Sequence, residues 1–125
     1  MEDSGKRYNA LKDKSVLFSI RIIKLYKYLT DNKKEYVMAK QLLKSGTSIG
    51  ANISEAIFAE SNADYIHKYA ISQKECSETL YWLTILQETE YLTKEEYVSM
   101  NDDCIELLKL LTSTIVTLKK KTSSN

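Results

Sequence analysis

Two pairs of polar side chains offer the sequence's best prospect of chemistry. Asn52 and Glu55 are three residues apart, and so are Glu75 and Glu78. On a helix this spacing places both members of a pair on one face, one turn apart. Facing carboxylates can hold a di-iron centre, but such centres also need Glu-x-x-His motifs. No glutamate stands three residues before His67, the single histidine of the sequence. We therefore expect no metal and interpret the four residues as a polar network that fixes helix register.

The other reactive residues are isolated from one another. His67 has no partner at a spacing typical of a nucleophile–base pair, so a surface or interface position is the favoured interpretation. Cys76 and Cys104 form no CxxC pattern, and two buried reduced thiols are favoured over a disulfide. Gly46 and Gly50 do not belong to a phosphate-binding loop, because no GK[ST] sequence follows them. The sequence thus predicts no enzyme, no cofactor and no small-molecule substrate.

Basic side chains concentrate in the first third of the chain. Residues 1–44 are net basic, whereas residues 45–90 are net acidic. Such asymmetry suits complementary packing, within the chain or between copies, and we expect Glu75 and Glu78 to meet basic residues there. A basic face that contacts nucleic-acid phosphates is the alternative interpretation. The residues considered are Arg21, Lys40 and Lys44 for the pairs with Glu75 and Glu78, and Lys14, Arg21, Lys24, Lys40 and Lys44 for a nucleic-acid face.

The stretch SGTSIGANISEA, residues 45–56, holds two of the three glycines and decides the fold. A ladder of residues spaced alternately by three and four runs through it without a break, which predicts one continuous helix. That ladder is Ala39, Leu42, Gly46, Ile49, Ile53 and Ala56. Each interior glycine costs a helix about 1 kcal/mol relative to alanine. We therefore expect a neighbouring backbone to approach closely at Gly46.

Four helices are expected, over about residues 12–30, 35–60, 62–88 and 94–119. Ser61 or Asn62 can cap the third helix, and Thr93 with Glu96 forms a capping box for the fourth. The third helix carries a second ladder, namely Ile66, Tyr69, Gln73, Cys76, Leu80, Leu83 and Gln87. The chain contains no proline, which also favours helices. The predicted fold is all-α, an antiparallel up-down-up-down four-helix bundle with a long central helix 2–helix 3 hairpin, in a single domain of residues 1–125.

The chain shows no signal peptide and no apolar run long enough to span a bilayer. We therefore expect a soluble protein of the cytoplasm with no membrane partner.

Aromatic and aliphatic residues exceed what a small helical core needs. The chain has nine tyrosines, and the apolar stripe of residues 12–30 is wider than one helix face. Surplus aromatic residues are typical of interfaces, which predicts contact between copies of the chain. The candidate interface residues are Tyr26, Tyr65, Tyr69 and Tyr81.

Two motifs resemble those of the 23S rRNA intervening-sequence protein family. The first, KSGTSIGANISEA, covers residues 44–56, and the second, ISQKECSETLYWLTIL, covers residues 71–86. The residues that carry the resemblance as a polar motif are Ser48, Asn52, Glu55, Glu75, Glu78 and Trp82. Many relatives have proline at the position of Gly50 and glycine at that of Ala56.

The resemblance implies a four-helix bundle that forms a ring-shaped homopentamer. A relative, the accessory protein of diversity-generating retroelements, binds nucleic acid with a basic barrel. We therefore hypothesise a non-enzymatic, self-assembling scaffold or adaptor. The alternative is a nucleic-acid-binding accessory protein, whose basic face five copies would multiply.

Overall fold

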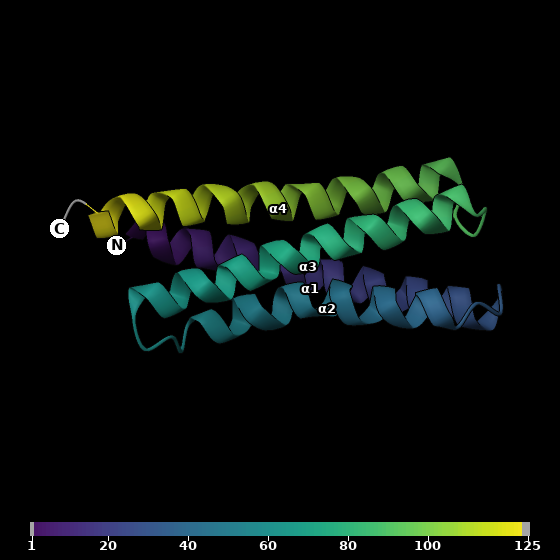
Figure 1. Cartoon of the computed structure of the whole chain (residues 1–125), viewed down its shortest axis with the longest axis horizontal. Coiled ribbons are helices and arrows are strands. Elements are labelled where there is room, and N and C mark those ends of the chain that lie inside the picture. The colour runs from purple at the N-terminus through teal and green to yellow at the C-terminus, as the bar shows by residue number, and fades with distance from the viewer. Residues whose placement is uncertain (1, 124–125) are drawn as a thin grey trace.

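The structure, a computed structural model, describes residues 2–123, with side chains for residues 5–121. It contains α1 (Glu2–Asp31), α2 (Val37–Ala56), α3 (Asn62–Glu88) and α4 (Lys94–Ser123), and no strand within the described residues. The helices run antiparallel in sequence order, so α1 and α3 point the same way (Figure 1). The predicted all-α four-helix bundle is confirmed.

Three predicted helix bounds differ from the structure. Helix α1 begins at Glu2 rather than near residue 12, because buried Leu11 continues the apolar spacing of the helix toward its start. Helix α2 ends at Ala56 rather than near residue 60, since the chain needs the following residues to reverse direction before α3. Helix α4 extends to Ser123 rather than residue 119.

Predicted capping residues begin the two later helices. The Ser61 side chain accepts a hydrogen bond from the Asp64 N–H, at 3.1 Å, at the start of α3. At α4 the reciprocal bonds of a capping box join Thr93 and Glu96, at 2.8 and 3.1 Å. These bonds satisfy N–H groups that have no partner inside the helix.

Helix α2 is continuous through both glycines, as the ladder predicts. A Cβ atom at Gly46 would lie 2.7–2.9 Å from three side-chain carbons of Ile22, which is fully buried on α1. The close approach is therefore made by a side chain, and the prediction of a neighbouring backbone was wrong. At Gly50 a Cβ would lie 3.2–3.3 Å from Ser15 and Ser19. Both glycines serve the packing of α1 on α2.

Small hydroxyl residues form the seam between α2 and α3. The Ser72 hydroxyl donates to the Ile49 carbonyl across the seam, at 2.8 Å, and the Thr79 hydroxyl bonds that of Ser45, at 2.9 Å. All of these groups are buried, so each hydrogen bond satisfies a polar atom that water cannot reach.

The core of α3 differs in part from the predicted ladder. Tyr69, Cys76 and Leu83 are buried as predicted. The other buried positions are Ser72, Thr79 and Leu86, whereas the predicted Gln73, Leu80 and Gln87 are only half-buried. The ladder keeps its spacing of three and four but rotates toward α2.

No helix among the described residues is both long enough and apolar enough to cross a lipid bilayer.

Candidate functional site

The residues of the predicted polar motif on α2 bond locally instead of forming a shared network. The Ser48 hydroxyl donates to the Lys44 carbonyl, at 2.6 Å, and the Asn52 amide donates to the Ser48 carbonyl, at 2.9 Å. Glu55 pairs with Lys68 of α3, at 3.2 Å. Of these contacts, only the pair of Glu55 with Lys68 joins two helices within the chain.

On α3, Glu75 and Glu78 lie one turn apart, and Glu75 is half-buried whereas Glu78 is exposed. Burial, followed by the charge of Glu78, raises the pKa of Glu75, while Lys74 and Lys44 oppose the shift. Lys44 thus acts on Glu75 as predicted, although at a distance beyond an ion pair. Among the described side chains, no three His, Cys, Asp or Glu residues converge to hold a metal ion.

Trp82, the last residue of the polar motif, lies half-buried one turn beyond Glu78. Its indole ring contacts Tyr81 edge-on, with ring centroids 4.9 Å apart. Its Nε1 atom is buried without a hydrogen-bond partner among the described residues. Trp82 thus packs against the core, and Tyr81 is the exposed member of this aromatic pair.

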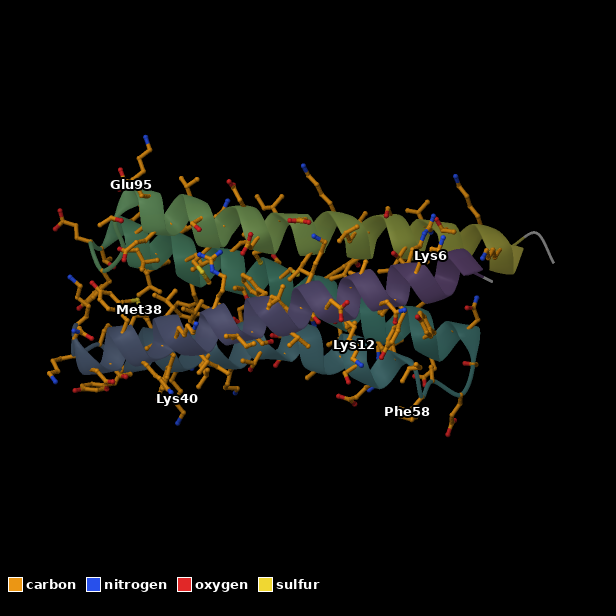
Figure 2. The ribbon with its side chains drawn as sticks, turned by 180° about the vertical axis from the view of Figure 1, so that it is seen from behind. Lys6, Lys12, Met38, Lys40, Phe58 and Glu95 are labelled. Carbon is orange, nitrogen blue, oxygen red and sulfur yellow. The ribbon has the colours of Figure 1, made fainter. Side chains whose placement is uncertain are left out.

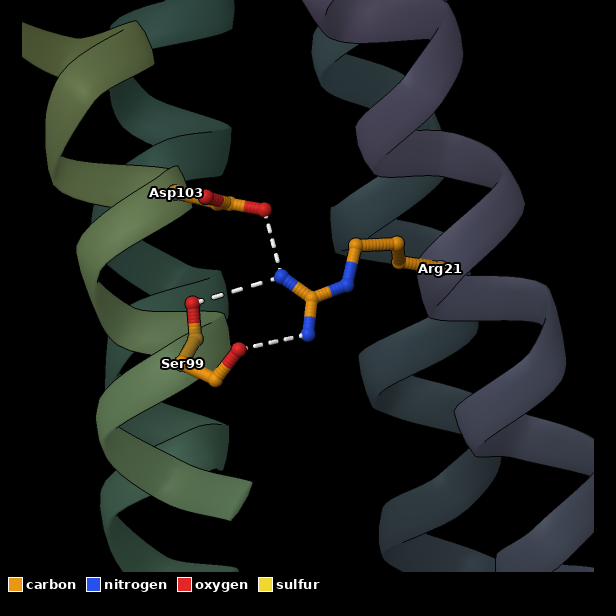
Figure 3. A network of polar contacts seen from close by, with 3 residues as sticks. All are labelled: Arg21, Ser99 and Asp103. Carbon is orange, nitrogen blue, oxygen red and sulfur yellow. Dashed lines mark hydrogen bonds and ion pairs between the residues drawn. The ribbon is translucent and has the colours of Figure 1, made fainter. Parts of the chain in front are cut away.

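Arg21 has a different partner from the one predicted. Its guanidinium contacts the Asp103 carboxylate at 2.5 Å and donates to the Ser99 hydroxyl at 2.7 Å and to the Ser99 carbonyl at 3.3 Å, all on α4 (Figure 3). Within the chain Arg21 does not pair with Glu75 or Glu78, because α1 and α3 are diagonal in the bundle and their backbones do not approach each other. Lys14 likewise pairs with Glu106 of α4. Sequence reasoning missed these α4 partners, since nothing in the sequence sets the α1–α4 register.

The five candidate nucleic-acid residues do not form one continuous face of the chain. Lys14 and Arg21 point toward α4 and are neutralised there. Lys24, Lys40 and Lys44 are exposed and form no ion pair within the described part of the chain. Lys24 lines a groove of about 570 Å³ between α1 and α4, whereas Lys40 projects from α2 (Figure 2).

The candidate interface tyrosines separate into buried and exposed groups. Tyr69 is completely buried, and its hydroxyl bonds that of half-buried Tyr65, at 3.0 Å. Burial, followed by this bond, raises the pKa of Tyr69. Its assignment to an interface was wrong, because it fills the core of its own chain. Tyr26 is also half-buried against the core, and Tyr81 alone of the four is largely exposed.

The remaining reactive residues have structural or surface positions. His67 is exposed on α3. Cys76 and Cys104 are buried free thiols, as predicted, and the Cys104 thiol donates to the Cys76 carbonyl at 3.6 Å. Their contact ties α3 to α4 and places no nucleophile at the surface.

The most distinctive surface feature is an apolar stripe on the outer side of α1, which consists of Val16, Leu17, Ile20 and Ile23. These side chains are 48, 64, 44 and 39% exposed, although the opposite side of the same helix is buried in the core. The predicted wide stripe of α1 is therefore real, and its own bundle covers only half of it. Phe58, 85% exposed, projects separately from the α2–α3 connection (Figure 2).

Known proteins resemble this chain in both sequence and structure. A protein with unknown function from the S23 ribosomal protein family of Bacteroides thetaiotaomicron VPI-5482, whose crystal structure is at 1.70 Å resolution, is 55% identical to this chain. The match has a TM-score of 0.86 and covers 87% of this chain and 97% of that one. No curated protein matches the sequence. A family model for the 23S rRNA-intervening sequence protein matches residues 8–113. The chain belongs to the 23S rRNA-intervening sequence protein family.

Proposed function

We propose that the protein is a non-enzymatic scaffold or adaptor that assembles with copies of itself. The observation that carries this proposal is the uncovered stripe of Val16, Leu17, Ile20 and Ile23 on α1. Contiguous apolar side chains on an otherwise charged surface are typical of protein–protein contacts. The family resemblance supports an assembly of five copies.

The size of the stripe sets what assembly can gain. Full burial of one aliphatic side chain stabilises by about 1.5–3 kcal/mol, and these four are already about half-covered. Completing their burial would therefore contribute roughly 4 kcal/mol. Association itself costs at least about that much, so the stripe alone does not hold a stable oligomer. A second surface must therefore contribute to a stable assembly.

The alternative function, binding of RNA or DNA, would depend on Lys24, Lys40 and Lys44. These residues are exposed, but they come from two helices, and the other two candidates, Lys14 and Arg21, are already neutralised by α4. An oligomer would repeat them and so strengthen contact with phosphates.

Light scattering of the purified protein, at low and high salt and with or without mixed RNA and DNA, tests both functions. The scaffold proposal predicts a multiple of the 14.4 kDa chain mass that nucleic acid does not change. A mass that rises with nucleic acid only at low salt would replace it with the alternative. A mass of 14.4 kDa at every concentration would contradict self-assembly.

A further inference from the structure

We propose that the outer side of α1 in one copy packs against the outer side of α3 in the next copy, with the two helices side by side and parallel. Each copy then uses two different surfaces, one for each neighbour. This inference rests on the proposed self-assembly and names the surfaces that carry it. On α1 the contact runs along the ladder Asp13, Val16, Ile20, Ile23 and Lys27, which includes three of the four residues of the apolar stripe. The α3 stripe is the ladder Lys74, Glu78, Tyr81, Ile85 and Glu88.

Both ladders lie outside the bundle and have the spacing of a helix–helix contact. Their members are separated alternately by three and four residues, which aligns them along one side of a helix. Every member is exposed, apart from half-buried Ile85. Tyr81 is 56% exposed at the centre of the α3 stripe, where an aromatic side chain is typical of an interface.

The charges of the two surfaces are complementary. Beside the apolar residues of α1 stand three lysines and one aspartate, whereas beside Tyr81 stand three glutamates and one lysine. These groups are Lys12, Lys24, Lys27 and Asp13 on α1, and Glu75, Glu78, Glu88 and Lys74 on α3. A symmetric contact between two α1 stripes would double the excess of positive charge. Contact between α1 and α3 balances it, which favours the heterologous arrangement.

The register of the bundle places the two stripes at matching heights. Arg21 meets α4 at residues 99–103. On α3, Cys76 and Thr84 meet α4 on either side of that same stretch. Tyr81 lies between Cys76 and Thr84, so it stands at nearly the height of Ile20, the neighbour of Arg21.

From this central pair, equal steps along the two helices bring opposite charges together. Two helical turns toward the C-terminus of each helix lead to Lys27 on α1 and Glu88 on α3. Two turns toward the N-terminus lead to Asp13 and Lys74. Because α1 and α3 run in the same direction (Figure 1), a rotation about an axis along the bundle aligns all three pairs without sliding one copy past the other.

The test uses two full-length variants that each disable one surface. Ile20→Asp places a charge at the centre of the α1 stripe, and Tyr81→Asp does the same on the α3 stripe. Val116→Asp, which changes a similarly exposed aliphatic residue on α4, is the matched control. We expect each of the first two variants alone to have the single-chain mass of 14.4 kDa by light scattering. Mixed, they should form a species of twice that mass, because one intact surface of each kind remains. The control should retain the wild-type mass.

The outcomes separate this inference from the proposal beneath it. A wild-type protein that assembles while Tyr81→Asp retains its mass would overturn the α1–α3 contact and indicate pairing of α1 with itself. Assembly that survives both substitutions would exclude both stripes, and a monomeric wild type would overturn self-assembly itself.

Exchanging the charges of Lys27 and Glu88 provides a second test that leaves the apolar contacts intact. Lys27→Glu and Glu88→Lys should each weaken assembly, and the variant with both substitutions should restore it. Circular dichroism should show the same helix content for every variant. Absence of any restoration in the double variant would also contradict the proposed register.

Discussion

Replacement of Gly46 by alanine tests the packing of α1 on α2 with a single methyl group. The new Cβ would lie 2.7, 2.8 and 2.9 Å from three carbons of Ile22, closer than such atoms approach one another. Ile22 is fully buried, so it cannot rotate into solvent to make room. Forcing an extra methyl into a filled core costs typically about 1–3 kcal/mol. Alanine also recovers about 1 kcal/mol of helix propensity, which leaves a net loss between about 0 and 2 kcal/mol.

Gly50→Ala is the matched control for this substitution. Its Cβ would meet Ser15 and Ser19 at 3.2–3.3 Å, where shifts of a few tenths of an ångström suffice. The same helix-propensity gain then dominates, and we expect stability equal to the wild type or up to about 1 kcal/mol higher. Thermal unfolding should thus rank Gly50→Ala above Gly46→Ala by several degrees, since about 1 kcal/mol shifts the Tm of such a domain by about 2–8 °C.

The assay is urea unfolding followed by circular dichroism, for both variants and for Ile22→Ala with and without Gly46→Ala. Removing the Ile22 side chain opens a cavity at a cost of about 2–5 kcal/mol, but it also frees the space that the new methyl needs. The double variant should therefore be more stable than the sum of the single effects predicts, by about 1 kcal/mol or more. A Gly46→Ala protein as stable as Gly50→Ala, with no coupling to Ile22, would refute the close-packing account.

Three further predictions concern the other contacts. Arg21→Ala and Asp103→Ala should show a coupling of only about 0.5–1 kcal/mol in a double-mutant cycle, because both side chains are more than a third exposed and water screens the pair; a coupling above about 3 kcal/mol would contradict this. Glu75→Gln should raise the urea midpoint at pH 7 and lose this advantage near pH 3. The pKa of Glu75 is raised in the folded state, so the protonated side chain stabilises the fold at low pH, and this stability is lost as the pH rises through that pKa. Glutamine, which has no charge to lose, should therefore gain over glutamate only at pH 7; an equal effect of the substitution at both pH values would exclude a charge effect. The hydrogen bond to Cys76 and burial raise the pKa of the Cys104 thiol, so labelling of both cysteines by a thiol reagent should proceed only as fast as the bundle opens; immediate labelling of the native protein would contradict their burial.

The order of the four helices along the chain and the continuity of α2 were predictable, because both follow from the spacing of apolar residues in the sequence. The ladder through Gly46 identifies a helix where glycine content alone suggests a loop, and its regular register is the signal. Thr93 with Glu96 is predictable for a similar reason, since a capping box is defined within four consecutive residues. Such local patterns do not depend on how the helices are arranged in space.

Features that depend on the rotation and register of whole helices were not predictable. The α3 ladder was predicted from its spacing alone, which fits more than one rotation of the helix, and the structure instead buries the smaller Ser72 and Thr79 against α2. Tyr69 was assigned to an interface although it is buried in the core. Its place on the predicted ladder already indicated the core, whereas the surplus of tyrosines suggested an interface. The partner of Arg21 depends on the α1–α4 register, which the sequence does not encode locally.

The central claim is that the outer stripe of α1 is a contact between copies. Sedimentation velocity of the wild type and of Ile20→Asp, at matched concentrations, measures this most directly. We expect a wild-type species of several chains, and for Ile20→Asp a folded species of 14.4 kDa. A wild type that sediments as a single chain, or an Ile20→Asp variant that assembles as the wild type does, would contradict it.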